Sequence, residues 1–256
     1  MSSARVAPLA SSIGLSTMAP AMVEATNYYR WIADSIAPAV GRRVLDVGGG
    51  RGSLLSFFLD RERLVALDLS ADAVAYLEAA FRAHPNVEAL HGDVTSPELQ
   101  QRLAGQRIDT ILCTNVLEHV EDDRAMLSSF AAILGPTGGR LALQVPAHGW
   151  LYGSLDAAAG HHRRYTRREV RAKLAAAGFA IDRAAYMNAA AVPGWWVAGR
   201  VRRQGLADSE DTNAQVRFYD RYLIPVARRL EAVVPPPFGL SVLALARALP
   251  RHAGAT

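Results

Sequence analysis

The sequence predicts an α/β fold in which a mostly parallel sheet carries a ligand at its edge. Short apolar runs alternate with helical segments through the middle of the chain, a rhythm typical of parallel strands joined by helical crossovers. Glycines at positions 48, 50 and 52 follow the first run, where a sharp turn and close ligand approach favour residues without a side chain. Asp68 ends the second run, where sheets of this kind present a carboxylate to ribose hydroxyls. Together these features predict a site for an adenosine-containing ligand.

Each strand and helix is predicted from its own residues. Apolar runs predict strands at residues 44–47, 64–67, 87–90, 108–114, 139–145, 179–186 and 240–246. Apolar spacing and end signals predict helices at 52–59, 71–83, 122–134, 166–177, 192–203 and 213–233, with a short helix opening at Ser96-Pro97. The clearest end signals are Thr166 as a cap with Glu169 three residues later, and Gly178 after the last turn.

The remaining segments complete the outline of one domain over residues 1–256. Residues 1–19 are rich in serine and alanine and are expected to be flexible, and residues 20–40 are expected to form a helical lid. Residues 146–165 form a long loop without periodicity, which predicts an active-site segment. Residues 188–238 separate the last two strands and predict a helical insertion that builds part of a substrate pocket.

The composition indicates the size of the core and the cellular compartment of the protein. Half of the 256 residues are hydrophobic, which is enough for a full core. The single cysteine, Cys113, excludes an internal disulfide and lies in an apolar run, so we expect a core thiol in a reducing compartment. The sequence has no signal-peptide pattern and no apolar window of the roughly 18 residues that a membrane span needs. These features predict a cytoplasmic protein.

The charge is positive and unevenly distributed. The net charge is +4, and Lys173 is the only lysine among 28 cationic residues. Arginines cluster at 163, 164, 167, 168 and 171 and again at 200, 202 and 203, but no series of aromatic residues accompanies them. A solvated helix face is therefore favoured over a nucleic-acid footprint. Trp195 and Trp196 precede the second cluster, which leaves transient contact with a membrane surface open.

The glycine turn separates two classes of adenosine-ligand site. A dinucleotide fingerprint has glycines at the first, third and sixth places, whereas here Gly52 comes one residue early and Ser53 takes the sixth place. The run Val44-Leu45-Asp46-Val47-Gly48-Gly49-Gly50-Arg51-Gly52 resembles the S-adenosylmethionine motif of class I methyltransferases. The resemblance implies a Rossmann-like sheet of seven strands, mostly parallel with the last strand antiparallel, and helices on both faces. It also implies S-adenosylmethionine as methyl donor and S-adenosylhomocysteine as product.

Further motifs extend this resemblance from about Tyr28 to the C-terminus. His91-Gly92-Asp93-Val94 follows the third strand, and in the family an Asp at the place of Asp93 accepts a hydrogen bond from the adenine amino group. The run from Ile108 ends in Leu117-Glu118-His119, which implies that His119 lies near the sulfonium. The cofactor-binding residues that the resemblance implies are Tyr28, Asp46, Gly48, Gly49, Gly50, Gly52, Asp68, Leu69, Gly92, Asp93, Val94, Asn115, Val116 and His119.

A second resemblance covers the segments after the fifth strand. Gly160-His161-His162-Arg163-Arg164-Tyr165 resembles the Gly-His-x-Arg-Arg-Tyr signature of a bacterial methyltransferase subfamily. Asn188, Pro193-Gly194-Trp195-Trp196 and Pro237-Phe238-Gly239-Leu240-Ser241 follow it as in that group. Its members differ in substrate, so the signature does not reveal the acceptor. We expect a small-molecule acceptor in bacterial specialised metabolism.

The acceptor site is expected around the loop at 146–165. The candidate catalytic residues are His119, His161 and Tyr165; His119 could be a general base, because imidazole titrates near neutral pH, or could order the cofactor loop. The candidate acceptor-binding residues are Tyr29, His148, Tyr152, His162, Arg163, Arg164 and Trp195. The arginines either clamp an anionic acceptor or pair with Asp156 and hold the loop. No carboxylate pair at ligand spacing accompanies the histidines, so no metal is expected.

Three alternatives stay open beside a small-molecule methyltransferase. The arginines and tryptophans fit a lipid or isoprenoid-phosphate acceptor at a membrane. The basic charge fits a nucleic-acid methyltransferase. The motifs also fit a non-catalytic protein that binds S-adenosylmethionine. The sequence leaves open whether oxygen, nitrogen or carbon is methylated, and it leaves the oligomeric state open.

Overall fold

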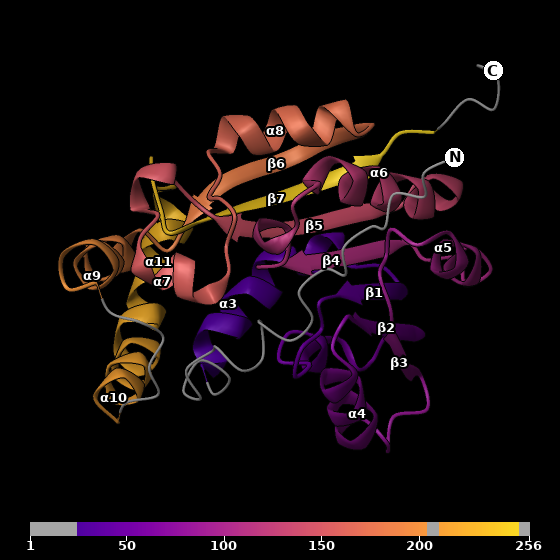
Figure 1. Ribbon diagram of the computed structural model, residues 1–256, viewed down its shortest axis with the longest axis horizontal. Coiled ribbons are helices and arrows are strands. Elements are labelled where there is room, and N and C mark those ends of the chain that lie inside the picture. The colour runs from indigo at the N-terminus through magenta and orange to yellow at the C-terminus, as the bar shows by residue number, and fades with distance from the viewer. Residues whose placement is uncertain (1–24, 204–209, 251–256) are drawn as a thin grey trace, which may run out of the picture.

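The computed structural model describes residues 25–203 and 210–250 and shows a seven-stranded sheet with helices on both faces (Figure 1). The strands are β1 (Arg43–Val47), β2 (Arg63–Asp68), β3 (Val87–His91), β4 (Thr110–Thr114), β5 (Arg140–Pro146), β6 (Phe179–Met187) and β7 (Ser241–Ala248). They lie in the order β3-β2-β1-β4-β5-β7-β6. The first five strands are parallel, whereas β7 runs antiparallel to both β5 and β6. The predicted Rossmann-like sheet with an antiparallel last strand is confirmed.

Strand residues alternate between two cores. Leu45, Ile111 and Leu143 face a core shared with α5 (Pro97–Ala104), α6 (Asp123–Leu134) and α8 (Arg167–Ala176). Val44 and Leu112 face a core shared with α3 (Thr26–Ile36), α4 (Ala71–Ala80) and α11 (Ile224–Val233). Because these strands are buried on both sides, they read as continuous apolar runs in the sequence.

Side-chain caps fix where helices begin. Ser96 and Thr166 each accept a hydrogen bond from the backbone N–H three residues later, at 3.3 Å and 3.2 Å. The Glu169 carboxylate in turn accepts from the Thr166 N–H at 2.7 Å, which completes the predicted capping box. No helix within the described ranges is long and apolar enough to cross a membrane.

Two segments differ from their predictions. The helix expected at 52–59 is only a 3₁₀ turn, Leu55–Phe58. Gly52 has a φ of +71°, outside the right-handed helical region, and the following Leu54, Leu55 and Phe58 anchor the chain directly in the core. The loop expected at 146–165 contains a helix, α7 (Ser154–Ala159), whose six residues are too few to show a helical period.

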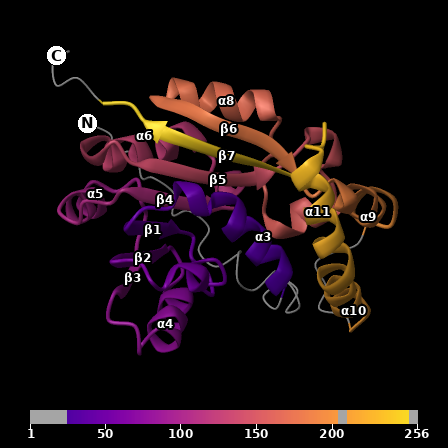
Figure 2. The same cartoon turned by 180° about the vertical axis from the view of Figure 1, so that it is seen from behind.

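The insertion before β7 consists of helices that reach back to the N-terminal helix. α9 (Val192–Trp196) continues in a π-helical turn over Val197–Val201. A second π-helical turn, Tyr219–Leu223, joins α10 (Glu210–Phe218) to α11. Asp220 in that turn accepts hydrogen bonds from the backbone N–H groups of Asn27 at 3.2 Å and Tyr28 at 2.8 Å. The insertion therefore caps α3, which lies beside α11 in both views (Figure 2).

The expected lid helix at 20–40 corresponds to α3, which begins at Thr26 and ends at Ile36. The expectation that residues 1–19 are flexible lies outside the described residues, as do residues 204–209 of the insertion. The division into one domain with a lid, a loop and an insertion stays a prediction.

Candidate cofactor and acceptor site

The glycine turn after β1 is held against β2 by its own backbone. The N–H groups of Gly48 and Gly49 both donate to the Leu67 carbonyl, at 2.8 Å and 3.2 Å. Gly48 has a φ of +71°, and a Cβ there would lie 2.4 Å from Cγ2 of Val116. The turn thus needs glycine for both conformation and space, as the sequence predicts.

Asp68 closes the turn from the end of β2. Its Oδ2 accepts from the Gly50 N–H at 3.0 Å, and its Oδ1 accepts from the Ser70 N–H at 2.9 Å. Asp68 as a whole is only partly buried at the carboxyl edge of the sheet. Leu69 follows with 41% of its surface exposed. Asp46 lies just inside this edge, and burial, reinforced by the charge of Asp68, raises its pKa to about 7.

The ends of β3 and β4 extend the same edge. Asp93 uses its Oδ1 to accept from both the N–H and the hydroxyl of Thr95, each at 2.8 Å. Gly92 donates to the Asp68 carbonyl at 3.0 Å, while Val94 is buried in the core. Asn115, at the end of β4, has a φ of +53°. The structure therefore places the ends of β1 to β4 side by side at the carboxyl edge of the sheet, where open α/β sheets form their ligand crevice.

Helix α3 brings two tyrosines to this crevice. The Tyr28 hydroxyl accepts a hydrogen bond from Nε2 of Gln144 at 2.7 Å, and burial raises the pKa of Tyr28. The ring of Tyr29 lies edge-on to that of Tyr28, with centroids 5.7 Å apart. Sequence reasoning missed Gln144, although a glutamine within an apolar strand was the available signal.

A compact cluster of Glu118, His119 and His161 lies beyond the end of β4. Glu118 and His119 belong to the 3₁₀ turn Leu117–His119, and one ligand atom from each of the three residues lies within 4.8 Å of the others. Burial raises the pKa of Glu118 to about 8. Burial and then the neighbouring His161 lower the pKa of His119 to about 4, so His119 is neutral at physiological pH. Sequence reasoning named both histidines as site residues. It missed that Glu118 and His119 meet His161, which lies 43 residues after Glu118 in the sequence.

Asp156 organises the loop on the far side of this cluster. Its Oδ1 accepts from Nδ1 of His161 at 2.8 Å and from Nε of Arg164 at 2.7 Å. Burial opposes ionisation of Asp156, but the hydrogen bond from His161 and the charge of Arg164 hold its pKa below the usual range. The Arg164 side chain is 1% exposed. Of the two alternatives for Arg164, the geometry matches pairing with Asp156.

Several predicted site residues lie away from the cluster or are already engaged. Arg163 bonds to the Glu121 carbonyl at 2.9 Å and pairs with Asp123 at 3.2 Å. Tyr165 is buried in the core, and its hydroxyl donates to Asp123 at 3.0 Å, so it supports the fold from inside. The His148 ring stacks on Tyr186 with centroids 4.6 Å apart. These contacts do not support a catalytic role for Tyr165 or an anion clamp at Arg163.

The insertion completes the wall around the signature loop. Tyr152 donates its hydroxyl proton to the His161 carbonyl at 2.7 Å and accepts at its own carbonyl from Arg200 at 3.1 Å. The guanidinium of Arg164 lies 4.9 Å from the centre of the Trp195 ring, and the buried indole N–H of Trp195 has no partner in the part of the chain that the structure describes. His162 is exposed, and its backbone N–H donates to the Glu118 carbonyl at 2.8 Å.

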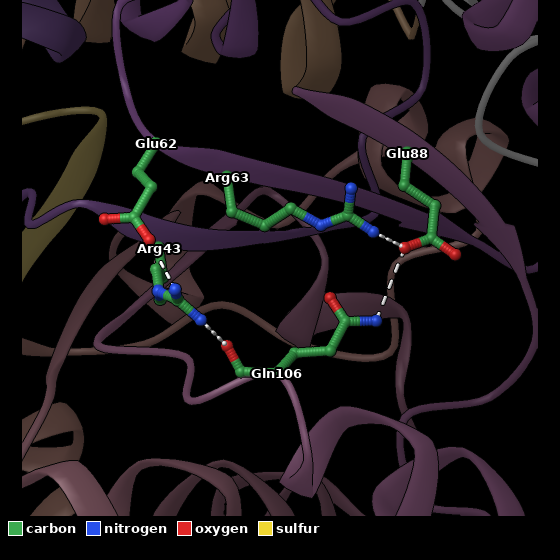
Figure 3. Close-up of a pocket in the computed structure, with 5 residues that line it drawn as sticks. All are labelled: Arg43, Glu62, Arg63, Glu88 and Gln106. Atoms are coloured by element: carbon green, nitrogen blue, oxygen red, sulfur yellow. Dashed lines mark hydrogen bonds and ion pairs between the residues drawn. The ribbon is translucent and has the colours of Figure 1, made fainter. Parts of the chain in front are cut away.

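A separate hollow lies at the opposite end of the strands (Figure 3). Its lining residues are Arg43, Glu62, Arg63, Glu88 and Gln106. Arg43 pairs with Glu62 and Arg63 with Glu88, so its charges neutralise one another. Because parallel sheets bind ligands at their carboxyl ends, this amino-terminal hollow is not the candidate site.

The sheet order, the antiparallel β7 and the glycine turn facing Asp68 define the fold of a class I methyltransferase. A methyltransferase-domain family matches residues 25–184. The chain belongs to that methyltransferase family.

Individual relatives are similar over part of the chain. A ribosomal RNA small subunit methyltransferase A from Geobacter metallireducens is 35% identical over 122 residues, which are 43% of this chain and 44% of that protein. A ubiquinone biosynthesis O-methyltransferase from Rhodopseudomonas palustris is 35% identical over 106 residues, which are 41% of each protein. This chain therefore spans less than half of each of these curated relatives.

The solved structures extend the likeness of fold to most of the chain. The YcgJ protein from Bacillus subtilis has a TM-score of 0.57 at 17% identity. The alignment covers 88% of this chain and 100% of the YcgJ chain. At that identity the likeness shows the fold alone.

Proposed function

We propose that the protein transfers a methyl group from S-adenosylmethionine to a small-molecule acceptor. The observation that carries this proposal is the fixed carboxylate of Asp68, held by the N–H groups of Gly50 and Ser70 where such sheets bind ribose. Asp93 supports it, because both hydrogen bonds from Thr95 use Oδ1. In the described part of the chain no group bonds to Oδ2, which suits the adenine amino group.

The proposed acceptor pocket lies between His119, the signature loop and the insertion. Trp195 offers a buried N–H that has no partner among the described residues, and the ring of His119 is neutral at physiological pH. The Gly-His-x-Arg-Arg-Tyr signature supports a bacterial methyltransferase but leaves the acceptor open, so a small acceptor of specialised metabolism is the part of the proposal that the labelling experiment below tests. Catalysis would come mainly from holding acceptor and methyl group close and in line, with a base needed only where the acceptor loses a proton.

Calorimetry of S-adenosylmethionine binding tests the donor site. Asp68→Ala should weaken binding at least about tenfold, because hydrogen bonds to a charged carboxylate contribute about 1.5–3 kcal/mol each. Asp60→Ala is the matched control, since Asp60 is an exposed acid in the turn before β2. Unchanged affinity in Asp68→Ala would contradict the assignment of the donor.

Methyl-labelled S-adenosylmethionine tests the acceptor. Incubation with cell extract should place the label in the small-molecule fraction. Label in RNA or DNA would favour a nucleic-acid methyltransferase instead. Tight donor binding without transfer to any fraction would indicate a non-catalytic binding protein.

A lipid at an anionic membrane surface is the second candidate acceptor, and an exposed apolar stripe favours it. Phe218, Tyr222, Val226 and Leu230 recur every four residues from α10 to α11 and are 58%, 53%, 52% and 66% exposed. Arg217, Arg221 and Arg229 adjoin the stripe and are also exposed. A basic amphipathic surface of this kind fits the interface of an anionic bilayer.

Vesicle flotation tests this second candidate. The protein should float with phosphatidylcholine vesicles that contain phosphatidylserine, and the double variant Val226→Glu/Leu230→Glu should not. Tyr76→Glu on α4 is the control, because Tyr76 is 44% exposed on another face. The lipid candidate would be ruled out if the double variant floated with the vesicles, or if the wild-type protein did not.

A further inference from the structure

The cluster of Glu118, His119 and His161 has the composition of a metal site. Two imidazoles and one carboxylate converge from two segments, with one ligand atom of each within 4.8 Å of the others. Ligand atoms around a tetrahedral ion bound at about 2.1 Å lie about 3.4 Å apart. Side-chain movements of at most about 1.4 Å, the difference between 4.8 Å and about 3.4 Å, would therefore close the set around an ion.

Glu118 is the group that calls for a ligand. It is 0% exposed, and neither of its carboxylate oxygens has a hydrogen-bond partner among residues 25–203 and 210–250. A polar group buried in this way costs several kcal/mol unless it is paired. Nε2 of His161 lies 3.9 Å from Oε1 of Glu118, beyond hydrogen-bond distance. The charge of Arg164 favours ionisation of Glu118, but burial outweighs it, so the pKa of Glu118 stays raised.

The surrounding residues orient both histidines as metal ligands are oriented. Nδ1 of His161 is held by Asp156 at 2.8 Å, which leaves Nε2 on the side of Glu118. Asp156 is itself held by Arg164 at 2.7 Å and by the Gly153 N–H at 3.0 Å. The backbone of Gly160 hydrogen-bonds the ring of His119. Histidine ligands of metals characteristically give their second nitrogen to a carboxylate or a backbone carbonyl.

We propose that Glu118, His119 and His161 bind one divalent transition-metal ion that holds an acceptor oxygen beside the methyl donor. Two nitrogens and one oxygen suit Zn²⁺, Mn²⁺, Fe²⁺ or Co²⁺ better than Mg²⁺ or Ca²⁺, which prefer oxygen ligands. Three protein ligands leave positions open for an acceptor, as in catalytic metal sites.

An acceptor that binds the ion through oxygen would carry a hydroxyl group. This part of the inference rests on the proposed function. Binding to the ion lowers the pKa of the hydroxyl, whose proton leaves to solvent. The oxygen lone pair then forms the bond to the methyl carbon. The electron pair of the breaking carbon–sulfur bond stays on sulfur, which gives the neutral thioether.

Metal titration of the tag-free protein tests the site. After chelation and dialysis, Zn²⁺ and Mn²⁺ are titrated by calorimetry, Mg²⁺ is titrated in parallel, and Co²⁺ is followed by its visible absorption. We expect one equivalent to bind, with Mg²⁺ at least tenfold weaker. His161→Ala and the isosteric Glu118→Gln should each weaken binding at least tenfold. His84→Ala, which changes a histidine packed against Phe81 away from the cluster, should leave it unchanged.

The outcomes separate this inference from the proposed function. Wild-type affinity no higher than that of the variants, with folding verified by circular dichroism, would overturn the metal site. Donor binding in the same metal-free protein would then still support the proposed function. Metal binding without donor binding would retain the site and overturn the proposed reaction.

Discussion

The two halves of the crevice are held together by different kinds of interaction. On the donor side, the ends of β1 and β2 are joined by backbone N–H groups that bond to Leu67 and Asp68. On the acceptor side, a backbone hydrogen bond joins the signature loop to Glu118, and the buried carboxylate of Asp156 holds the loop together by pairing with His161 and the buried Arg164. The donor half thus depends on backbone geometry, and the acceptor half depends on buried charge.

The largest expected effect is the loss of Asp156 from the acceptor half. Asp156→Ala leaves the buried guanidinium of Arg164 unpaired and frees His161, so we expect about 3–5 kcal/mol of destabilisation in urea unfolding. Asp182→Ala is the matched control, because its ion pair with Arg247 is exposed and should contribute less than about 1 kcal/mol. Equal losses of unfolding free energy in the two variants would show that the acceptor half does not depend on buried charge.

Titration of Asp46 probes the donor half. Its folded pKa of about 7 lies above the unfolded value of 3.8, so the folded state binds the proton more tightly. The contribution of this group is therefore fully present below about pH 4 and is lost as pH rises to about 7, by up to about 4 kcal/mol. Asp46→Asn should remove this slope from the pH dependence of unfolding, whereas Asp60→Asn should keep it. An unchanged slope in Asp46→Asn would mean that Asp46 is already ionised in the folded protein.

Backbone geometry in the donor half is tested at Gly48. Gly48→Ala adds a strained φ of +71° and a Cβ 2.4 Å from Val116, so we expect a loss of about 2–4 kcal/mol. Gly138→Ala shares the positive φ, at +61°, but meets nothing within 4 Å, so it should lose only about 1–2 kcal/mol. Adding Val116→Ala to Gly48→Ala removes the methyl group that the new Cβ meets, so it should recover the stability that Gly48→Ala loses beyond Gly138→Ala. A double variant no more stable than Gly48→Ala would contradict the steric explanation.

The donor half was predictable from the sequence because its determinants are local. The glycine turn and Asp68 belong to one strand–helix–strand unit, in which the Gly50 N–H meets Asp68 only 18 residues later, and the cap at Ser96 acts over three residues, so spacing reveals them. The acceptor half was not predictable in the same way. Glu118 meets His161 across 43 residues. Single-sequence reasoning has no distance that links them. It named Asp156 as a possible partner of the arginines but could not choose between that pairing and an anion clamp, which the Arg164–Asp156 contact at 2.7 Å now decides in favour of the pairing.

Asp220 shows this same limit most clearly, since no local pattern marks a residue that caps a helix almost 200 residues away.

The smallest expected effect tests whether the insertion connects the two halves through α3. Asp220 accepts from the N–H groups of Asn27 and Tyr28, so Asp220→Ala should cost about 1 kcal/mol, the usual contribution of a helix cap. Hydrogen exchange should accelerate at the first turn of α3 and leave α8, which has its own cap at Thr166, unchanged. Donor affinity should fall modestly, because Tyr28 reaches Gln144 from this turn. Unaltered exchange at α3 would show that packing of Trp31 and Ile36 alone holds the helix over the crevice.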